Sequence, residues 1–535
     1  MNGLMQDRPL SVTGLLRRVE QLFGHKRVIT ATAHGEHHAT WGDVASRARR
    51  LATALDHLEV PLQARVGTFG WNSQRHVELY LGVPGSGRVL HTLNHRLFAE
   101  QIFHIVNDAA DDVLFVDRSL LSTVWPCIAR LPTVRWIVVM DDGDSTEVPD
   151  DPRILDYEEL VATAEPSALM DADESAAAGL CYTSGTTGNP KGVLYSHRST
   201  VLHALLLLGV DNFAISEHDV VMPIVPMFHV NAWGLPYAAM LAGSDLVLPG
   251  PAMSPQALID QMARHRVTFS AAVATIWRSM EPLLGGKDLS SLRMVVSGGG
   301  PVPDSLSRAW QDVAGIPLTN AWGMTETSPV VTCSRLSTQH GSAGRDARRL
   351  VLGTPGPNIP LTEMRVVDDD GVTVEAGESR PGELQVAGPT IASGYFGADA
   401  GADSFTEDGW LRTGDVATID EFGYLRIVDR VKDLVKSGGE WISSTALENE
   451  IMAHEDVHEA AVIGIRDDRW GERPLAFVVP LPGRRVDESD LRSHLRDRVA
   501  SWWIPERLVI VEEIPKTATG KFSKTALRKM VSGGG

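Results

Sequence analysis

Short apolar runs alternate with longer amphipathic segments along the first two thirds of the chain. The runs RVGTFG (65–70), DVLFVD (112–117) and VRWIVVMD (134–141) are nearly continuous, which is typical of strands buried on both faces of a parallel sheet. Between such runs, segments like WGDVASRARRLATALDHL (41–58) have the spacing of amphipathic helices. The alternation predicts an α/β fold with mainly parallel strands.

The same pattern continues in the middle of the chain. Residues 196–210 predict a helix, residues 245–250 a strand, and residues 254–273 a helix that runs into a further strand. Near the start, residues 13–26 predict a helix whose apolar face carries Leu15, Leu16, Val19, Leu22 and Phe23. We therefore expect a large body made of two parallel-sheet α/β subdomains.

The pattern changes at about Thr354. Short strands with frequent glycine and proline follow, namely TEMRVVDDDG, GELQVAGP, GWLRTGD and GYLRIVDR, which predict a small β-rich subdomain over 354–431. After DRVKDLVKSGGE, helical and strand patterns alternate again and predict a C-terminal α+β domain. We expect an N-terminal domain of residues 1–431 and a C-terminal lid of residues 432–535, with a hinge near Lys432 and closure over a ligand.

Composition narrows the class of protein. The 535 residues suffice for roughly three or four compact units. A net charge of −19 argues against broad binding to nucleic acid or anionic membranes. The cysteines, Cys127, Cys181 and Cys333, are too widely spaced for a disulfide framework or a metal cluster, which favours a reducing cytoplasm. We expect neither a signal peptide nor a membrane span, since Pro223 and Pro226 interrupt the apolar stretch 220–233.

A loop rich in glycine and hydroxyl side chains follows the apolar run AAAGLC. It reads YTSGTTGNPKG over residues 182–192, and its hydroxyls, open backbone N–H groups and lysine suit a phosphate. A P-loop requires Gly-x-x-x-x-Gly-Lys-Ser/Thr, and Pro190 stands where the second glycine belongs. The loop is therefore not a P-loop, and taken alone it fits a phosphate-binding loop or a surface turn.

Three further features carry possible chemistry, and each also has an ordinary structural explanation. Thr325 and Glu326 in NAWGMTETS suit one Mg²⁺ whose other ligands are phosphate oxygens, or a solvated acidic turn. Asp415, at the expected strand end LRTGD, suits the two hydroxyls of a ribose, or begins a turn. Lys521 lies in the loop IPKTATGK, where an exposed surface lysine is the alternative.

The motifs in their order resemble the adenylate-forming superfamily of acyl-CoA synthetases, adenylation domains and firefly-type luciferases. The resemblance covers about residues 12 to 530 and rests on YTSGTTGNPKG, VPMFHVNAW, SGGGPVP, AWGMTETSP, WLRTGD, DRVKDLVKSGGEWIS and IPKTATGKFSK. Within the superfamily, VPMFHVNAWGLPYAAML and KSGGEWISSTALENEIMAH look most like medium- and long-chain fatty acyl-CoA synthetases and their short-acid relatives, including the methylmercaptopropionate ligases.

The resemblance implies a two-step reaction. Members of this family join a carboxylate to ATP, giving acyl-AMP and pyrophosphate, and then transfer the acyl group to the thiol of coenzyme A. We therefore expect an AMP-forming acyl-CoA ligase that uses ATP, coenzyme A and Mg²⁺. Its acid would be a medium- or long-chain fatty acid or a bulky hydrophobic acid, and the resemblance also implies a homodimer.

The same resemblance implies a nucleotide site. The phosphate loop would comprise Thr183, Ser184, Gly185, Thr186, Thr187, Gly188 and Lys191. Thr183 and Glu326 would hold Mg²⁺, and Thr325 would contact the α-phosphate. The adenine slot would be lined by Gly299, Gly300, Asn320, Ala321 and Trp322. Asp415 would hold the ribose with help from Arg430, and further nucleotide contacts would come from Lys432, Lys436 and Trp441.

Catalysis is implied to depend on the lid. Lys521 matches the family's catalytic lysine, which bridges the carboxylate and the α-phosphate, and it would act with Glu326, Thr325 and Lys191. After adenylation the lid would rotate about Lys432, withdraw Lys521 and present residues 438–441 for thioester formation.

The resemblance also locates the acyl pocket. His229, Val230 and Trp233 would form its gate or its wall, and Val273, Ala274 and Gly298 would border the acyl chain. Ala274 stands where relatives usually have proline, which loosens the backbone and removes the volume of the ring. A bulky cyclic acid therefore stays an alternative to a straight chain.

Other functions remain open at this point. The chain could deliver its adenylate to a carrier protein or another acceptor, although GEWIS and the complete lid favour coenzyme A. A luciferase-like monooxygenase shares the same motifs. A binding protein without catalysis is disfavoured by the joint presence of Lys191, Glu326, Asp415 and Lys521.

Overall fold

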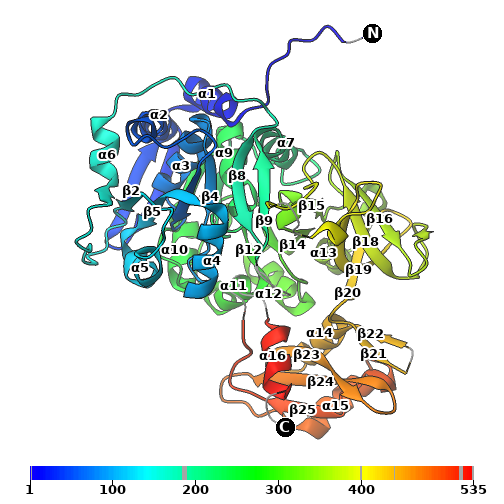
Figure 1. Cartoon of the computed structure of the whole chain (residues 1–535). Coiled ribbons are helices and arrows are strands. Elements are labelled where there is room, and N and C mark those ends of the chain that lie inside the picture. Colours follow the sequence, from blue (N-terminus) through cyan, green and yellow to red (C-terminus); the bar gives the residue numbers. More distant parts are fainter. Residues whose placement is uncertain (2, 184–189, 398–400, 439, 517–521, 533–535) are drawn as a thin grey trace.

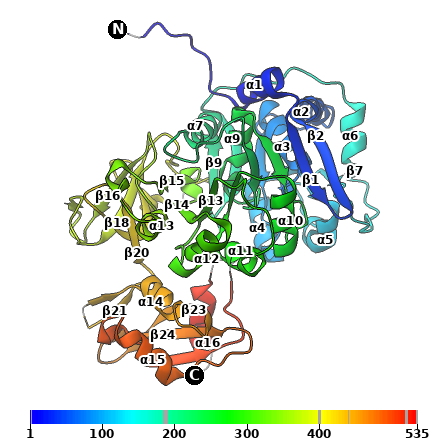
Figure 2. The ribbon, with the colours of Figure 1, turned by 180° about the vertical axis from the view of Figure 1, so that it is seen from behind.

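The apolar runs of the first half form the strands of two separate sheets in the body of the molecule (Figure 1). The structure is a computed structural model and describes residues 1, 3–183, 190–397, 401–438, 440–516 and 522–532. Figure 2 shows the same arrangement from behind, with the C-terminal domain below the body in both views. The predicted α/β class, with a β-rich region and a C-terminal α+β domain, is confirmed.

The first sheet has parallel pairs throughout, except for its last pair. Its order is β7 (Ile154–Asp156), β6 (Trp136–Met140), β5 (Asp111–Asp117), β3 (Arg65–Phe69), β4 (Val89–Thr92), β8 (Ala177–Tyr182) and β9 (Gly192–Ser196), with β9 antiparallel to β8. The helices along this part of the chain are α2 (Trp41–His57), α3 (Gln74–Gly85), α4 (Ala99–Ala109), α5 (Leu121–Ile128) and α6 (Tyr157–Thr163).

The second sheet is parallel except at its two ends. Its order is β15 (Val330–Cys333), β14 (Leu318–Gly323), β13 (Met294–Gly298), β12 (Phe269–Val273), β10 (Val220–Pro223), β11 (Asp245–Leu248), β1 (Arg27–Thr32) and β2 (Gly35–Thr40). The accompanying helices are α7 (His197–Leu207), α8 (Val230–Trp233), α9 (Leu235–Ala242), α10 (Pro255–Arg264), α11 (Ala274–Met280), α12 (Asp304–Ala314) and α13 (Arg345–Gly353). One continuous apolar core joins residues of both sheets.

The N-terminal helix α1 (Val12–Phe23) packs against α9 and α2 of this body. Leu15, Leu16 and Val19 are buried as predicted, but Leu22 is 54% exposed. The buried face is centred near Leu16 and Val19, so Leu22 lies at its margin and turns toward solvent. Among the described residues, no helix is both long enough and apolar enough to cross a membrane.

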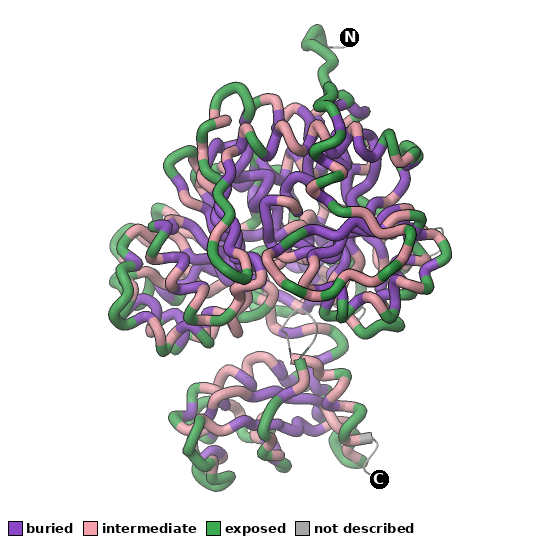
Figure 3. Tube along the Cα trace, turned by 90° about the vertical axis from the view of Figure 1, so that its left-hand side faces the viewer, coloured by how far each residue is buried: buried purple, intermediate pink, exposed green. Residues whose placement is uncertain are grey.

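Two smaller sheets complete the chain. The antiparallel sheet of the β-rich region has the order β17 (Thr373–Val374), β16 (Glu363–Val367), β18 (Gly382–Ala387), β19 (Leu411–Ile419) and β20 (Leu425–Arg430). The C-terminal sheet contains β22 (Glu440–Ile442), β21 (Val435–Ser437), β24 (Gly471–Pro480), β23 (Val457–Asp467) and β25 (Arg507–Ile510). Its helices are α14 (Ser444–Met452), α15 (Glu488–Arg496) and α16 (Lys524–Ser532). Figure 3 shows that the body and the C-terminal domain each have buried residues in their interior.

The C-terminal domain is bonded to the body at the end of β20. Asp429 is buried on β20, and its Oδ2 accepts the backbone N–H and the hydroxyl of Ser444, each at 2.5 Å. Ser443 caps α14 and donates its hydroxyl to the carbonyl of Val428 at 2.5 Å. The start of α14 is therefore fixed to the last strand of the body. The boundary at Lys432 stays a prediction.

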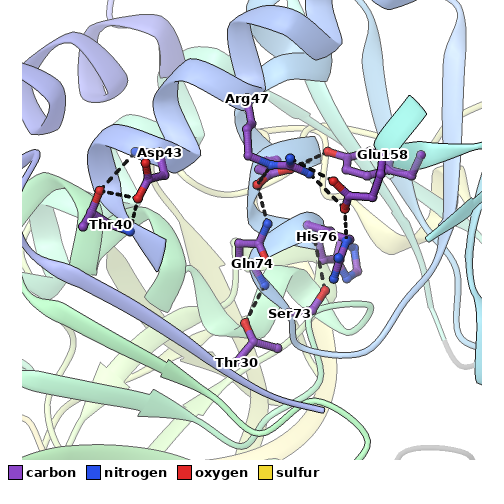
Figure 4. A network of polar contacts seen from close by, with 11 residues as sticks. Thr30, Thr40, Asp43, Arg47, Ser73, Gln74, His76 and Glu158 are labelled. Atoms are coloured by element: carbon purple, nitrogen blue, oxygen red, sulfur yellow. Dashed lines mark hydrogen bonds and ion pairs between the residues drawn. The ribbon is translucent and has the colours of Figure 1, made fainter. Parts of the chain in front are cut away.

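A buried ionic network ties three helices of the body together. The carboxylate of Glu78 is fully buried on α3 and accepts from Arg47 Nε (2.7 Å), Gln74 Nε2 (2.6 Å) and the hydroxyl of Tyr157 (2.6 Å). Figure 4 shows Arg47 between Gln74 and Glu158. Arg47 Nη1 lies 2.9 Å from Glu158 Oε2. Burial raises the pKa of Glu78, and the nearby Arg47 charge opposes this rise. Arg47 therefore compensates a carboxylate that water does not reach.

Replacing Arg47 with alanine leaves Glu78 buried without its cation. We expect Arg47→Ala to lower the free energy of unfolding by about 3–5 kcal/mol, measured by urea unfolding followed by tryptophan fluorescence. The control is Arg17→Ala, which removes an exposed pair with Asp171 and should cost about 0–1 kcal/mol. If the two variants lose equal free energy of unfolding, the buried network contributes no more stability than an exposed ion pair.

Candidate active site

Thr183 and Lys191 close the base of the glycine-rich loop. The N–H of Thr183 donates to the carbonyl of Lys191 (2.9 Å), and the N–H of Lys191 donates to Thr183 Oγ1 (3.1 Å). The loop connects the antiparallel strands β8 and β9, because Tyr182 pairs with Gly192. A P-loop instead leads into a helix whose N-terminus holds the phosphate. This loop therefore has neither the spacing nor the helix of a P-loop.

Thr325 and Glu326 lie in a short 3₁₀ helix, η3 (Thr325–Thr327), which is separated from the end of β14 by one residue. Both side chains are buried. The hydroxyl of Tyr195 donates to the carbonyl of Thr325 (2.7 Å), and the hydroxyl of Tyr395 donates to Glu326 Oε1 (2.7 Å). Burial raises the pKa of both phenols, and the charge of Glu326 raises that of Tyr395 further, so both groups stay protonated donors. No motif marks either tyrosine in the sequence.

Asp415 is held by two side chains of the body. Trp322 donates its Nε1–H to Asp415 Oδ2 (2.9 Å), and Arg430 Nε lies 3.0 Å from Asp415 Oδ1. Asp415 and Arg430 stand opposite each other in the pairing of β19 with β20. The structure thus brings together three residues that the sequence assigned to the nucleotide.

The expected place of Asp415 at a strand end is wrong. Strand β19 continues to Ile419, and Asp415 lies in its middle. Gly414 has a φ of 69°, and the pairing with β20 shifts register after Val416. The turn that the glycine suggested is therefore a local irregularity within a longer strand.

The residues predicted to line an adenine slot lie at or near the ends of two neighbouring parallel strands. Gly298 and Ala321 are paired in the register of β13 and β14, and Gly299 and Gly300 follow directly after β13. Gly299 has a φ of 79°, which favours glycine. The side chain of Asn320 donates to the carbonyl of Gly353 (3.0 Å). The side-chain amide of Asn320 therefore already has a hydrogen-bond acceptor within the protein.

Trp233 belongs to a turn of left-handed backbone. Val230, Asn231, Ala232 and Trp233 have φ values of 46°, 51°, 49° and 56°, and Gly234 follows with 72°. Each non-glycine residue in this conformation costs roughly 1–2 kcal/mol, so the turn is strained.

The segment just before this turn is anchored by Asn72. The side chain of Asn72 accepts the N–H of Met227 (2.7 Å) and donates to the carbonyl of Pro223 (2.8 Å). His229, the half-buried residue that precedes the turn, links the anchored part to the strained part. The segment 223–227 is therefore held in place by Asn72, and the strained turn 230–233 follows it.

The indole of Trp233 closes the space beside the end of β13. Trp233 is buried, and a Cβ added to Gly298 would lie 2.7 Å from its Cη2. Val273 pairs with Gly298 across β12 and β13, and Ala274 begins α11 immediately afterwards. Three predicted acyl-pocket residues, Gly298, Val273 and Ala274, are thus neighbours, and the Trp233 ring lies against Gly298.

A small cavity of about 10 Å³ lies beside the left-handed turn, which is space for roughly one water molecule. It is lined by Tyr195, Thr200, His203, Val230, Asn231, Gly234, Tyr237 and Ser328. The N–H of Val330 donates to His203 Nε2 (3.2 Å), which leaves the proton on Nδ1. Burial lowers the pKa of His203 to about 3, so the imidazole is neutral.

The remaining predicted residues belong to the C-terminal segments or lie outside the described residues. The Lys436 ammonium lies 4.2 Å from the ring centroid of Trp441, on the hairpin β21–β22. Desolvation by burial, followed by the charge of Arg430, lowers the pKa of Lys432. The residues outside the described part of the chain are Ser184, Gly185, Thr186, Thr187, Gly188 and Lys521.

The donor set fits a magnesium ion that shares its ligands with phosphates. Glu326 offers a buried carboxylate that Tyr395 orients, and Thr183 offers a hydroxyl at the loop base. Mg²⁺ prefers such oxygen ligands and is commonly bound through one or two carboxylates plus phosphate oxygens. Within the described residues, no three His, Cys, Asp or Glu side chains gather as a metal centre. Phosphate oxygens would therefore have to complete the coordination.

The sequence matches two family models and many known proteins over nearly its whole length. A model described as AMP-binding enzyme matches residues 16–396, and one described as AMP-binding enzyme C-terminal domain matches residues 446–521. The long-chain-fatty-acid–CoA ligase of Thermus thermophilus is 44% identical, over 98% of this chain and 96% of its own. The 3-methylmercaptopropionyl-CoA ligase of Ruegeria pomeroyi is 42% identical, over 99% of this chain and 98% of its own.

The fold agrees with these matches. The crystal structure of an anthranilate CoA ligase in complex with anthranoyl-AMP has a TM-score of 0.87 to this structure. The two are 26% identical, and the comparison covers 99% of each chain. With both family models matched and relatives above 40% identity over nearly all of the chain, the protein belongs to the family of AMP-binding enzymes.

Proposed function

We propose that the protein is an AMP-forming acyl-CoA ligase that converts ATP, a carboxylic acid and coenzyme A into acyl-CoA, AMP and pyrophosphate through an acyl-adenylate. Its acid is a medium- or long-chain fatty acid or a bulky hydrophobic acid, and Mg²⁺ accompanies the ATP. Action in the cytoplasm as a homodimer belongs to the same proposal and rests on family resemblance.

One chain of contacts gives this proposal its main support. Lys191 lies over the ring of Tyr395, whose hydroxyl binds Glu326, four residues beyond Trp322. Trp322 in turn binds Asp415. The proposed phosphate-binding lysine and the proposed metal carboxylate are thereby linked through Tyr395, and four residues of backbone connect them to the tryptophan that binds the proposed ribose carboxylate.

In the first half-reaction, the body holds ATP while the carboxylate of the acid attacks the α-phosphorus. Asp415 accepts the ribose hydroxyls, Lys191 and the loop bind the β- and γ-phosphates, and Thr325 contacts the α-phosphate. Thr183 and Glu326 would hold Mg²⁺, which would supply positive charge against the phosphates. Lys521 donates to both the carboxylate and the α-phosphate, where negative charge accumulates in the transition state.

In the second half-reaction, the thiol of coenzyme A attacks the acyl-adenylate and AMP leaves. The lid of residues 432–535 turns about Lys432, so that Lys521 departs and residues 438–441 face the adenylate. Such a rotation has to break or rearrange the bonds of Asp429 and Val428 to the start of α14. One site thereby serves two reactions.

Trp233 serves as the gate of the acyl pocket. In this structure its indole fills the space beside Gly298, and the turn that carries it is strained. Release of Val230 to Trp233 from the left-handed conformation would lower the strain and move the indole, while Asn72 keeps the preceding segment in place. The strain thus lowers the free-energy cost of opening.

The overall reaction is tested with a panel of carboxylic acids. We expect acid-dependent release of pyrophosphate from ATP, and acyl-CoA only when coenzyme A is present, measured by a coupled pyrophosphate assay and mass spectrometry. Pyrophosphate release without any thioester would instead favour another acyl acceptor. No release with any acid would contradict acid activation altogether.

Lys521→Ala separates the two half-reactions. We expect acyl-adenylate formation to fall about 10²–10³-fold, because one donor to the transition state is lost. Thioester formation from supplied acyl-AMP should stay close to that of the parent protein, since Lys521 is then withdrawn. Lys529→Ala, an exposed lysine on α16, is the matched control and should leave both rates unchanged. An equal loss in both half-reactions for Lys521→Ala would refute the rotation.

Two substitutions distinguish a gate from a fixed wall. Ala232→Gly stabilises the left-handed turn, so it should raise KM for the acid several-fold and leave KM for ATP unchanged. Trp233→Ala removes the indole and should lower KM for bulky acids most. If Ala232→Gly has no effect and Trp233→Ala weakens all acids equally, Trp233 is part of a fixed wall.

A further inference from the structure

Tyr395 contacts two of the groups that the proposed function assigns to the triphosphate. Its hydroxyl donates to Glu326 Oε1 at 2.7 Å, and the Lys191 ammonium lies 4.7 Å from the centroid of its ring. Tyr395 comes from the segment after β18, so it belongs to neither of the elements that carry these two residues. One side chain therefore bridges the end of the phosphate loop and the carboxylate after β14.

The backbone around Tyr395 is bonded to the same two elements. The N–H of Ala392 donates to the carbonyl of Glu326 (2.8 Å), and the N–H of Phe396 donates to the carbonyl of Gly192 (2.7 Å). Glu326 and Gly192 lie 134 residues apart in the sequence, by subtraction of their numbers. The segment 392–396 thus spans the distance between η3 and β9 and keeps it fixed.

The ring of Tyr395 is itself confined. Phe405 packs against it edge to face, with the ring centroids 5.8 Å apart. Gly401 has a φ of 78°, and a Cβ added there would lie 2.5 Å from Lys191 Nζ and 2.8 Å from Tyr395 Cε2. Backbone at Gly401 therefore closes over the contact between the lysine and the ring.

We propose that Tyr395 is a positioning residue for the magnesium–triphosphate group. Its hydroxyl orients the Glu326 carboxylate, and its ring holds the Lys191 ammonium. The proposal rests on the proposed function.

The two contacts suit this task for different reasons. A hydroxyl that donates to one oxygen of a carboxylate fixes the direction of the group and leaves lone pairs for a metal, and such supporting bonds strengthen metal binding. A cation over an aromatic face keeps its full charge and makes no hydrogen bond to the ring, so its N–H groups stay available for phosphate oxygens. Tyr395 therefore places both groups without neutralising either.

The test separates the hydroxyl from the ring. Tyr395→Phe keeps the ring and removes the bond to Glu326, and Tyr395→Leu removes both contacts. Tyr424→Phe is the matched control, because it removes a hydroxyl that donates to the carbonyl of Arg335 and not to Glu326. Binding of a non-hydrolysable ATP analogue is measured by calorimetry, once in EDTA and once over a range of Mg²⁺ concentrations. Adenylation is assayed in parallel.

For Tyr395→Phe, we expect the Mg²⁺ concentration that half-saturates analogue binding to rise about tenfold. Binding of the analogue in EDTA should stay unchanged, because the ring still holds Lys191. For Tyr395→Leu, binding in EDTA should also weaken about threefold. In a protein that already carries Lys191→Ala, adding Tyr395→Leu should not weaken analogue binding in EDTA any further, since the lysine that the ring holds is then absent.

Two outcomes overturn the positioning role. One is an unchanged Mg²⁺ requirement for Tyr395→Phe. The other is an equal loss with and without Mg²⁺, which would indicate a general structural effect. If Tyr395→Leu does not fold, the Mg²⁺ titration of Tyr395→Phe still decides the question. Failure of the parent protein to bind the analogue would instead count against the proposed function, so the two failures are distinguishable.

Discussion

The parallel direction of neighbouring strands determines where the candidate site lies. Within the second sheet, β12, β13 and β14 run parallel, so their carboxyl ends reach a common edge, and β8 runs parallel to β4 in the first sheet. The contacts of Tyr395 with Lys191, beside the carboxyl end of β8, and with Glu326, after β14, connect the two sheets at these ends. Segments that follow such ends gather at one place, where α/β proteins usually bind their ligands. Thr183 follows β8, Ala274 follows β12, Gly299 follows β13 and Thr325 follows β14. Residues from distant parts of the sequence are thereby gathered at strand ends.

Charged groups near these ends are oriented by the protein before any ligand arrives. Trp322 binds the carboxylate of Asp415, and Tyr395 binds that of Glu326. A carboxylate that a neighbouring donor already orients needs less rearrangement when its ligand binds. The strained turn at Trp233 is different, because its energy favours movement. The proposed nucleotide site is therefore rigid, and the proposed acyl pocket has a wall that is poised to change.

The sequence predicts the fold class because apolar periodicity follows directly from burial, as in the strand at 112–117 and the helix at 41–58. It predicts the neighbours Trp322, Asp415 and Arg430 only through family resemblance. It places Asp415 wrongly, since a glycine that bends a strand looks like one that ends it. Tyr395 could not be found, because its role arises from a contact with Glu326 that only the folded chain creates. The left-handed turn at 230–233 is hidden for a similar reason, as Val230, Ala232 and Trp233 do not favour that conformation.

The central claim is that the carboxylate of an acid becomes bonded to the α-phosphorus of ATP. An acid labelled with ¹⁸O in both carboxylate oxygens tests this most directly, with the products analysed by ³¹P NMR and mass spectrometry after one turnover in the presence of coenzyme A. The account predicts one ¹⁸O atom in the phosphate of AMP and none in pyrophosphate. Label in inorganic phosphate, formed together with ADP, would contradict it, because the acid would then have attacked the γ-phosphorus.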